Sequence, residues 1–590
     1  METTRQTPVT HLEADLAVVG GGLAGLCAAV AAARHGAAVI LVQDRPVLGG
    51  NASSEIRMGI CGAHGKDRKE TGLLEELQLN NVYHNPLMRY TLWDDILYSL
   101  AIQEPNLTLL LNTSVHAVTT DGPHITAITA WNANEYRHYR IAAQRYADCS
   151  GDGILHLSGA DCRHGREDPR EFNEDFLQTG GGDRRTMGNS ILLQLRRTDT
   201  HHPFLPPPWA HHYDDAFFAE RELTPQLRKP NLSYVNPHPD NNNFWWIEFG
   251  GNLDVIHDAG RIQRELKRMA YGIWNYMKNH PDGRCQHYDL DWIGSLPGKR
   301  ESRRFLGDIL LNQHDLMDGG HFHDTVCYGG WTIDDHHPDA FMKHGNLSEH
   351  HTPPSPFGIP YRALYSRNID NLWFAGRNIS CTHIAMSATR VMATCALMGQ
   401  AVGTAAALAT HHHCSPRDIY RHHLTELQLT LMEDDVFLPG LTRPVSDITQ
   451  TAHTDFPTLQ TAIDRNLDDT EHGAWLTPGQ HVLYTWTQPV TITACRLVFD
   501  SLLDFQDKRM RKLEALPDRK QLPARLPKAI RIETQTPNGT WQTLLRQDEL
   551  HCRLLRASWP PVTTTAMRLT VEQTWGSPSD QAHLFTIEYR

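Results

Sequence analysis

The stretch DLAVVGGGLAGLCAAVAAARHGAAVILV, residues 15–42, decides the fold of this chain. It places the spacing GxGxxG, at Gly20, Gly22 and Gly25, between an apolar run and an alanine-rich run, and it closes on a second apolar run. In this order the first glycine makes a tight turn and the second lets backbone N–H groups approach a pyrophosphate. The third lets a helix pack closely on the strand, and the N-terminus of that helix offers free N–H donors. The pattern therefore predicts a dinucleotide-binding unit with a strand at Leu16–Val19, a helix at 26–34 and a strand at Val39–Val42.

The residue that holds a ribose hydroxyl in such units is an acid at the end of the second strand, about 20 residues after the glycines. Here Gln43 stands at that position, Asp44 follows, and Arg45 comes next. Gln43 and Asp44 can both bond a hydroxyl, and the sequence leaves the choice open. The chain then stays rich in glycine and serine as far as Gly65, which is what a loop laid along a larger, planar cofactor needs.

Composition and charge narrow the class of protein. With 590 residues the chain is too long for one core and should contain about two to four domains. Its net charge of −13 and the lack of a basic tract argue against nucleic acid and anionic membranes as partners. Apolar segments are expected to be too short for a membrane span, and the polar N-terminus shows no secretory signal. Eleven cysteines without CxxC spacing indicate a reducing compartment, so we expect a cytoplasmic location.

The chain contains 36 histidines, and many of them are adjacent in sequence, as in the run His411 to His413. Adjacent side chains face opposite ways on a strand and diverge on a helix, so such pairs rarely share an ion. Neither HExxH nor a zinc-type spacing of cysteine and histidine is present. We therefore expect solvated loop histidines and no bound metal.

The rest of the chain divides by composition. Alternating segments between residues 114 and 146 predict an antiparallel meander, and a helix at 383–408 brings the chain back to the first domain. Between them lies a polar stretch without clean periodicity, and short alternating strands follow Trp475. The expected domains are 1–160, the first part of the dinucleotide-binding domain; 161–356, an inserted substrate domain; 357–436, the second part; 437–474, a linker; and 475–590, a β-sandwich.

Four polar stretches stand beside these elements. Asp152 lies between glycines in SGDG, which suggests a second backbone approach to the cofactor. The run GKRESRR, residues 298–304, is equally a salt-bridged helix start or part of a site, and VCYGGWTIDDHHP, residues 326–338, is equally a structural turn or a site. NLWFAGRN, residues 371–378, is a strand that runs into another glycine turn.

With these residues the chain resembles the FAD-dependent oxidoreductase family found in many bacteria. The matching stretches, spread over residues 15 to 410, are GGGLAGLCAA, RPVLGGNASSEIRMGICGAHG, YADCSGDG, GSLPGKRESRRFLGD, YGGWTIDDHHP, IPYRALYSRNIDNLWFAGRNIS and THIAMSATRVMATCALMGQAVGTAAAL. The tail resembles a galactose-binding-like, discoidin-type sandwich in its strand pattern and in VFDSLLDF. The resemblance implies an α/β fold: a Rossmann-like FAD-binding domain with an inserted α+β substrate domain, followed by a C-terminal β-sandwich.

FAD is the cofactor that this resemblance implies. Gly20, Gly22 and Gly25 would lie at the pyrophosphate, and residues 43 to 55 would lie along the ribose and ribityl chain. The candidate contacts of that loop and of the remaining shell are Gln43, Asp44, Arg45, Gly50, Asn51, Ser54, Glu55, Asp152, Gly376 and Arg377.

The leading hypothesis is an enzyme that oxidises a CH–OH group of a sugar or glycoside by hydride transfer to flavin N5. Such a reaction needs a base near the carbon and a cation near N1–C2=O of the reduced ring. His64, in the CGAHG loop, and His383, at the start of a helix, are the candidate bases because both follow loops expected to face the cofactor. Arg300, Arg303 and Arg390 are candidates for orienting substrate or balancing the flavin charge.

Two other functions remain consistent with the sequence. Transient oxidation followed by elimination would cleave a glycoside with no net redox change, and a carbohydrate-binding protein would keep the fold without catalysis. Cys61 and Cys381 are further residues expected to face the flavin, and a covalent flavin link through His64 or Cys61 is left open. The expected partners are a small-molecule or oligosaccharide substrate and an unidentified electron acceptor, while assembly as a homo-oligomer is left open.

Overall fold

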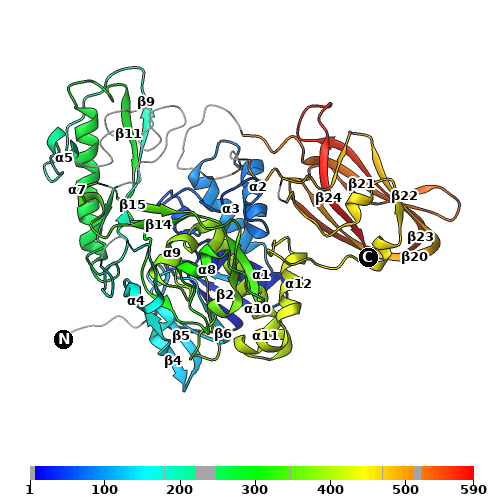
Figure 1. Ribbon diagram of the computed structural model, residues 1–590, viewed down its shortest axis with the longest axis horizontal. Coiled ribbons are helices and arrows are strands. Elements are labelled where there is room, and N and C mark those ends of the chain that lie inside the picture. Colours follow the sequence, from blue (N-terminus) through cyan, green and yellow to red (C-terminus); the bar gives the residue numbers. More distant parts are fainter. Residues whose placement is uncertain are drawn as a thin grey trace. The chain divides into compact units, whose positions relative to one another are not determined.

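The structure, a computed structural model, describes residues 7–177, 180–219, 247–345, 347–467, 469–505, 508, 510 and 520–590 (Figure 1). The chain divides into two compact units. Unit 1 comprises residues 1–64, 87–428 and 509–519, and unit 2 comprises residues 65–86, 429–508 and 520–590. Unit 1 thus joins segments near the start and past the midpoint of the chain, and unit 2 holds the C-terminal segments together with residues 65–86.

A mixed seven-stranded sheet organises unit 1. Its strand order is β3-β2-β1-β6-β5-β4, and β17 also pairs with β6. The neighbours among β3, β2, β1, β6 and β17 are parallel, whereas β4, β5 and β6 form the antiparallel meander expected from their alternating pattern. This arrangement confirms the Rossmann-like α/β class. The bounds are β1 Val9–Val19, β2 Val39–Val42, β3 Leu107–Leu110, β4 Thr113–Asp121, β5 His124–Asn132, β6 Arg137–Asp148 and β17 Leu372–Phe374.

Two helices far apart in the sequence pack against each other in unit 1. They are α1, Leu23–Arg34, and α10, Met392–His412. Gly399 and Gly403 of α10 lie directly on backbone carbonyl oxygens of α1, so a Cβ on either glycine would overlap the helix beside it. The single helix expected at 383–408 is instead two, because extended backbone at Val391 separates α9, His383–Thr389, from α10.

The apolar character of α10 corrects one expectation from the sequence. This 21-residue helix, with a mean hydropathy of 1.4 over its most apolar window, is long and apolar enough to cross a membrane. However, 89% of the window is buried inside the protein. Packing against α1 therefore accounts for the apolar run, as in the core helix of a globular domain.

The inserted region of unit 1 has its own apolar core around α7. The inward side of this helix includes Ile262, Leu266 and Ile273, which are fully buried among residues of the short strands nearby. The remaining elements of unit 1 are α3 Tyr90–Ile102, α4 Pro169–Phe172, α5 Asp215–Ala219, α7 Ala259–Lys278, α8 Gln313–Met317, β7 Cys162–Arg163, β8 Asn189–Ser190, β9 Leu193–Arg197, β10 Glu248–Phe249, β11 Tyr288–Ile293, β12 Arg304–Phe305, β13 Thr325–Gly329, β14 Ile333–His336, β15 Ser348–His351, β16 Phe357–Pro360 and α11 Pro416–His422.

Unit 2 contains an antiparallel, sandwich-like seven-stranded sheet of order β19-β24-β20-β23-β21-β22, with β18 paired to β20. Among the segments after Trp475, where short strands are expected, β20 is one long strand whose register shifts between Thr485 and Val490. The bounds are β18 His453–Thr454, β19 Ala474–Leu476, β20 His481–Phe499, β21 Pro527–Gln535, β22 Trp541–Gln547, β23 Leu554–Thr574, β24 Ala582–Tyr589, α2 Leu73–His84 and α13 Asp447–Gln450; α12, Leu424–Glu433, crosses the boundary between the units.

Candidate functional site

The glycine turn after β1 lies at the carboxyl end of the parallel strands. Gly20 has a φ of +101°, a conformation that favours glycine, and a Cβ on it would collide with the backbone of Cys149 and Ser150 beyond β6. Gly25, in the first turn of α1, would overlap the carbonyl oxygen of Gly20 if it carried a Cβ. Packing within the chain therefore requires two of the three glycines.

Gly22 is different, because none of the residues that the structure describes requires a glycine there. Its φ of −64° and ψ of 179° are open to any residue, and no atom lies within 4 Å of the place its Cβ would take. A group that approaches this backbone from outside does require it. Among the described residues no side chain caps α1, so the first N–H groups of that helix remain available to an anion. Both observations fit a bound pyrophosphate.

Gln43 supports the glycine turn from the end of β2. Its Oε1 accepts a hydrogen bond from the Gly21 N–H at 2.7 Å, and its Nε2 donates to the Val47 carbonyl at 3.1 Å. Both ends of the amide are therefore engaged in shaping the turn. The neighbouring Asp44 has an exposed carboxylate, 3.8 Å from Arg45 Nε. Of the two residues left open by the sequence, Asp44 is the one whose geometry suits a ribose hydroxyl.

The loop that follows holds its remaining candidate residues in distinct contacts. Arg45 pairs with Glu55 at 3.5 Å. Gly50 begins a 3-10 turn next to Gly49, which forms an isolated bridge with Gly22. The loop is therefore anchored to the glycine turn at one end.

Further along the loop, two residues reach other elements. Asn51 Nδ2 donates to the Lys299 carbonyl at 3.0 Å, and the Ser54 N–H donates to Asp94 Oδ1 at 2.9 Å. Burial raises the pKa of Asp94 to about 6. These bonds tie the loop to α3 and to the basic run at 298–304.

Asp152 gathers cations at the same edge of the sheet. Its carboxylate lies 2.6 Å from Lys299 Nζ and 3.0 Å from Arg377 Nη2, and its carbonyl accepts from Arg303 Nη1 at 3.2 Å. Burial would raise the pKa of Asp152, but the two cations outweigh it and lower that pKa. Gly376, with a φ of +110°, makes the turn that presents Arg377. Arg303, a candidate for orienting substrate or balancing the flavin charge, therefore contacts the Asp152 turn.

Lys299 is the member of this cluster that the sequence analysis missed. Its signal was present in the basic run, where four cations surround one carboxylate. Spacing along the chain does not show which of these cations face which partner. The fold brings the segment after Gly298 next to the Asp152 turn, although the two are far apart in sequence. This approach makes Lys299 the cation that pairs with Asp152.

His383 lies inside a buried ion network. Its Nδ1 is 3.0 Å from Glu301 Oε2 and its Nε2 is 2.9 Å from Asp335 Oδ1. Glu301 also contacts Arg304, which pairs with Glu167 at 2.7 Å. Burial would lower the pKa of His383, but the two carboxylates outweigh it and raise that pKa to about 10. A fully buried imidazole that is already protonated cannot take a proton from substrate, so the expected role of His383 as a base does not fit this geometry.

Arg300 and Arg390 belong to a second buried network. Arg300 Nη2 lies 2.6 Å from Glu248 Oε1, and Arg390 Nη2 lies 3.4 Å from Asp334 Oδ2. His336 connects them, with Nδ1 at 2.9 Å from Glu248 and Nε2 at 3.1 Å from Asp334. Both arginines are therefore paired with carboxylates of the protein. These pairs hold β14 in place, and neither arginine faces a substrate as an unpaired cation.

His64 has a setting unlike that of His383. Its ring stacks on Trp331, with centroids 4.4 Å apart and planes 20° from parallel. Its backbone N–H donates to the Gly330 carbonyl at 2.9 Å, and its backbone carbonyl accepts a hydrogen bond from Ser355 Oγ at 2.7 Å. The residue is half-buried, and the buried indole N–H of Trp331 has no hydrogen-bond partner in the described part of the chain. A buried donor without a partner calls for an explanation, such as a water molecule, an ion or a ligand that bonds it.

Helix α10 relates the loop of His64 to the glycine turn. At its start, the Ala393 N–H donates to the Cys61 carbonyl at 3.0 Å. Further along, Gly399 lies on Ala24 in the first turn of α1. The helical rise puts residues 393 and 399 about 9 Å apart along the axis. The His64 loop therefore lies beyond the pyrophosphate cradle along α10, on the side away from the body of α1.

Cys381, expected to face the cofactor, is fully buried, and burial raises the pKa of its thiol to about 12. It is a packing residue. Cys61 is partly exposed in the loop that precedes His64.

The chain matches the FAD dependent oxidoreductase family over residues 15–431. Because the match spans more than half of the chain, the protein belongs to this family. No curated protein sequence matches it.

Among solved structures, the chain is similar to L-proline dehydrogenase from P. horikoshii at 17% identity and a TM-score of 0.17, covering 28% of this chain and 27% of that one. It is similar to a geranylgeranyl bacteriochlorophyll reductase-like protein from Thermoplasma acidophilum at 12% identity and a TM-score of 0.32, covering 73% and 89%. It is also similar to the family 32 carbohydrate-binding module of Streptococcus pneumoniae EndoD at 12% identity and a TM-score of 0.17, covering 24% and 97%.

The protein is thus an FAD-dependent oxidoreductase, and FAD is its cofactor. The open backbone at Gly22 and the uncapped start of α1 fit the pyrophosphate, and the exposed carboxylate of Asp44 would bond the ribose. The cluster of Asp152, Lys299 and Arg377 would complete the shell. When bound, FAD supplies a two-electron acceptor that the side chains of the protein lack.

Replacing Gly22 by aspartate should lower FAD affinity by about 30-fold, or ~2 kcal/mol, because the new carboxylate lies against the pyrophosphate. The site of the Cβ is open, so the variant should fold. FAD content after purification and a titration of the apoprotein measure the effect. Gly22→Ala, which adds no charge, is the control and should keep most of its FAD. Equal FAD affinity in Gly22→Asp and the wild type would contradict the placement of the pyrophosphate at Gly22 and the start of α1.

The pKa of His383 predicts how stability depends on pH. Since it rises from 6.5 to about 10 in the folded protein, its contribution to stability is complete below pH 6.5. That contribution falls as pH rises through about 10, by at most about 1.4 kcal/mol per pH unit. Thermal midpoints, followed by the fluorescence of released flavin, should therefore drop between neutral pH and pH 10. In Asp335→Asn, which removes one carboxylate partner and so lowers the folded-state pKa of His383, the drop should end at lower pH and be smaller. Midpoints independent of pH in this range would contradict the assignment.

Proposed function

We propose that the enzyme oxidises a CH–OH group of a sugar or glycoside, with His64 as the base that accepts the hydroxyl proton on a ring nitrogen. The observation that carries this proposal is the half-buried His64 ring, stacked on Trp331 beside a buried, unsatisfied indole N–H. The indole can donate to a substrate oxygen while the stacked ring is held in one orientation.

The charge networks support this division of roles. His383 is held protonated between two carboxylates, and Arg300 is paired with Glu248. Neither is available for proton abstraction or for substrate charge. Of the two predicted bases, His64 is the one that is partly exposed, whereas His383 is buried. Sugar as the substrate class rests on the resemblance of the tail to a galactose-binding-like sandwich.

Anaerobic mixing of the holoenzyme with a panel of sugars and glycosides tests the proposal. A substrate should bleach the yellow absorbance of the oxidised flavin, and an added electron acceptor should restore it. If no compound of the panel bleaches the flavin, the assignment as a sugar or glycoside oxidoreductase is wrong. Glycoside cleavage without any acceptor would assign the flavin to transient oxidation and elimination instead.

A further inference from the structure

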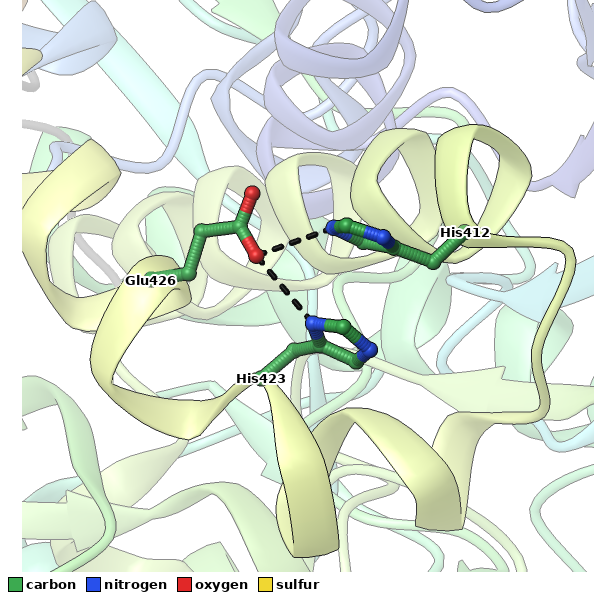
Figure 2. A group of neighbouring side chains, drawn as sticks. All are labelled: His412, His423 and Glu426. Atoms are coloured by element: carbon green, nitrogen blue, oxygen red, sulfur yellow. Dashed lines mark hydrogen bonds and ion pairs between the residues drawn. The ribbon is translucent and has the colours of Figure 1, made fainter.

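Three side chains of types that bind metals meet at the end of α10 and at the turn between α11 and α12 (Figure 2). His412 is the last residue of α10, His423 caps the C-terminus of α11, and Glu426 lies in the first turn of α12. Glu426 Oε2 is 2.9 Å from His412 Nε2 and 3.1 Å from His423 Nδ1. Figure 2 shows both rings directed at this one carboxylate oxygen.

The three side chains are close enough together to bind one metal ion. Zn²⁺ binds histidine nitrogen and carboxylate oxygen at about 2.0–2.2 Å, so two ligands on a tetrahedral ion lie about 3.4 Å apart. All three ligand atoms here lie within 4.8 Å of one another. The imidazole rings are stacked, with centroids 3.8 Å apart and planes 18° from parallel.

Helix electrostatics explain only part of this arrangement. An acid in the first turn of a helix is stabilised by the helix dipole, and a histidine beside it can form a hydrogen bond without any ion. Here, however, a single oxygen is shared by imidazoles that come from two different helices. The histidines are also not sequence neighbours, so the divergence that separates adjacent histidines does not apply to them.

We propose that His412, His423 and Glu426 bind one divalent transition-metal ion of the Zn²⁺ type, which clamps the end of α10 to the turn between α11 and α12. Two imidazoles and a carboxylate are a donor set suited to Zn²⁺ and its neighbours in the first transition series. With three protein ligands, a tetrahedral ion keeps one position for water. None of the three residues belongs to the FAD cradle, so the role proposed for the ion is to join these helix ends and not to take part in the oxidation.

Metal titration of the full-length holoenzyme, stripped with a chelator, tests the site. Co²⁺ should bind with a stoichiometry of one and give visible bands at longer wavelength than the flavin, and Zn²⁺ should displace it and raise the thermal midpoint. His412→Gln, His423→Gln and Glu426→Gln should each lower the affinity by about tenfold or more. FAD content should not change in any of them.

The neighbouring exposed histidines provide matched controls. His411→Gln and His422→Gln remove imidazoles from the same helix ends without touching the three ligands, and both should bind Co²⁺ as the wild type does. Binding spread over several weak sites, binding that survives the three ligand substitutions, or an unchanged thermal midpoint would overturn the proposal. Any of these results would leave the three side chains as a hydrogen-bonded surface cluster.

Discussion

Replacing Glu301 by glutamine is expected to lower the free energy of unfolding of unit 1 by about 3–5 kcal/mol, since removing one partner leaves buried charges uncompensated. The Glu301 carboxylate is fully buried between the His383 imidazole and the Arg304 guanidinium. It also accepts the Met187 N–H at 2.9 Å. Glutamine keeps the shape but removes the charge that balances two buried cations.

An exposed ion pair of the same unit provides the control for this prediction. Arg163 Nη1 lies 3.0 Å from Glu171 Oε2, with the side chains 32% and 40% exposed. Glu171→Gln should cost less than about 1 kcal/mol because water screens the pair. Denaturant titration followed by flavin release compares the variants on the same unit. If Glu301→Gln is no more costly than Glu171→Gln, the buried network contributes nothing beyond a surface pair.

The first βαβ unit could be predicted because its signals are local. The apolar runs at Leu16–Val19 and Val39–Val42 and the glycines between them lie within one continuous segment. The structure confirms both strands as parallel neighbours in the sheet. It also shows β1 beginning earlier, at Val9, because its polar first half pairs with the start of β6. A partner strand that lies more than 100 residues away cannot be identified from the local pattern.

The charge networks could not be predicted for the same reason. Glu301, Asp335 and His383 lie in three separate segments, and each resembles an ordinary polar residue in its own stretch of sequence. Sequence position beside a glycine turn made His64 and His383 look alike. Only the fold shows that His383 is enclosed by acids whereas His64 stacks on an aromatic ring. Burial and long-range partners, not residue type, separate a structural cation from a candidate base.

Replacing His64 by asparagine should lower the limiting rate of flavin reduction by about 100-fold or more, the usual contribution of a general base. Asparagine keeps a polar group in the loop but cannot accept the proton at neutral pH. FAD content should stay that of the wild type, because His64 lies beyond the pyrophosphate cradle along α10. The change should appear in the limiting rate more than in the half-saturating substrate concentration, since a base acts on the transition state rather than on binding alone.

A control variant separates the chemistry of His64 from the position of its loop. Ser355→Ala removes only the hydrogen bond from Ser355 Oγ to the His64 carbonyl, so the imidazole remains. Its reduction rate should fall by less than about tenfold, in line with the loss of one ordinary hydrogen bond of about 1 kcal/mol. Anaerobic stopped-flow mixing with any substrate that bleaches the flavin gives both rates. A His64→Asn enzyme that reduces its flavin as fast as Ser355→Ala would remove His64 from the reaction. The base would then have to come from another group near Trp331.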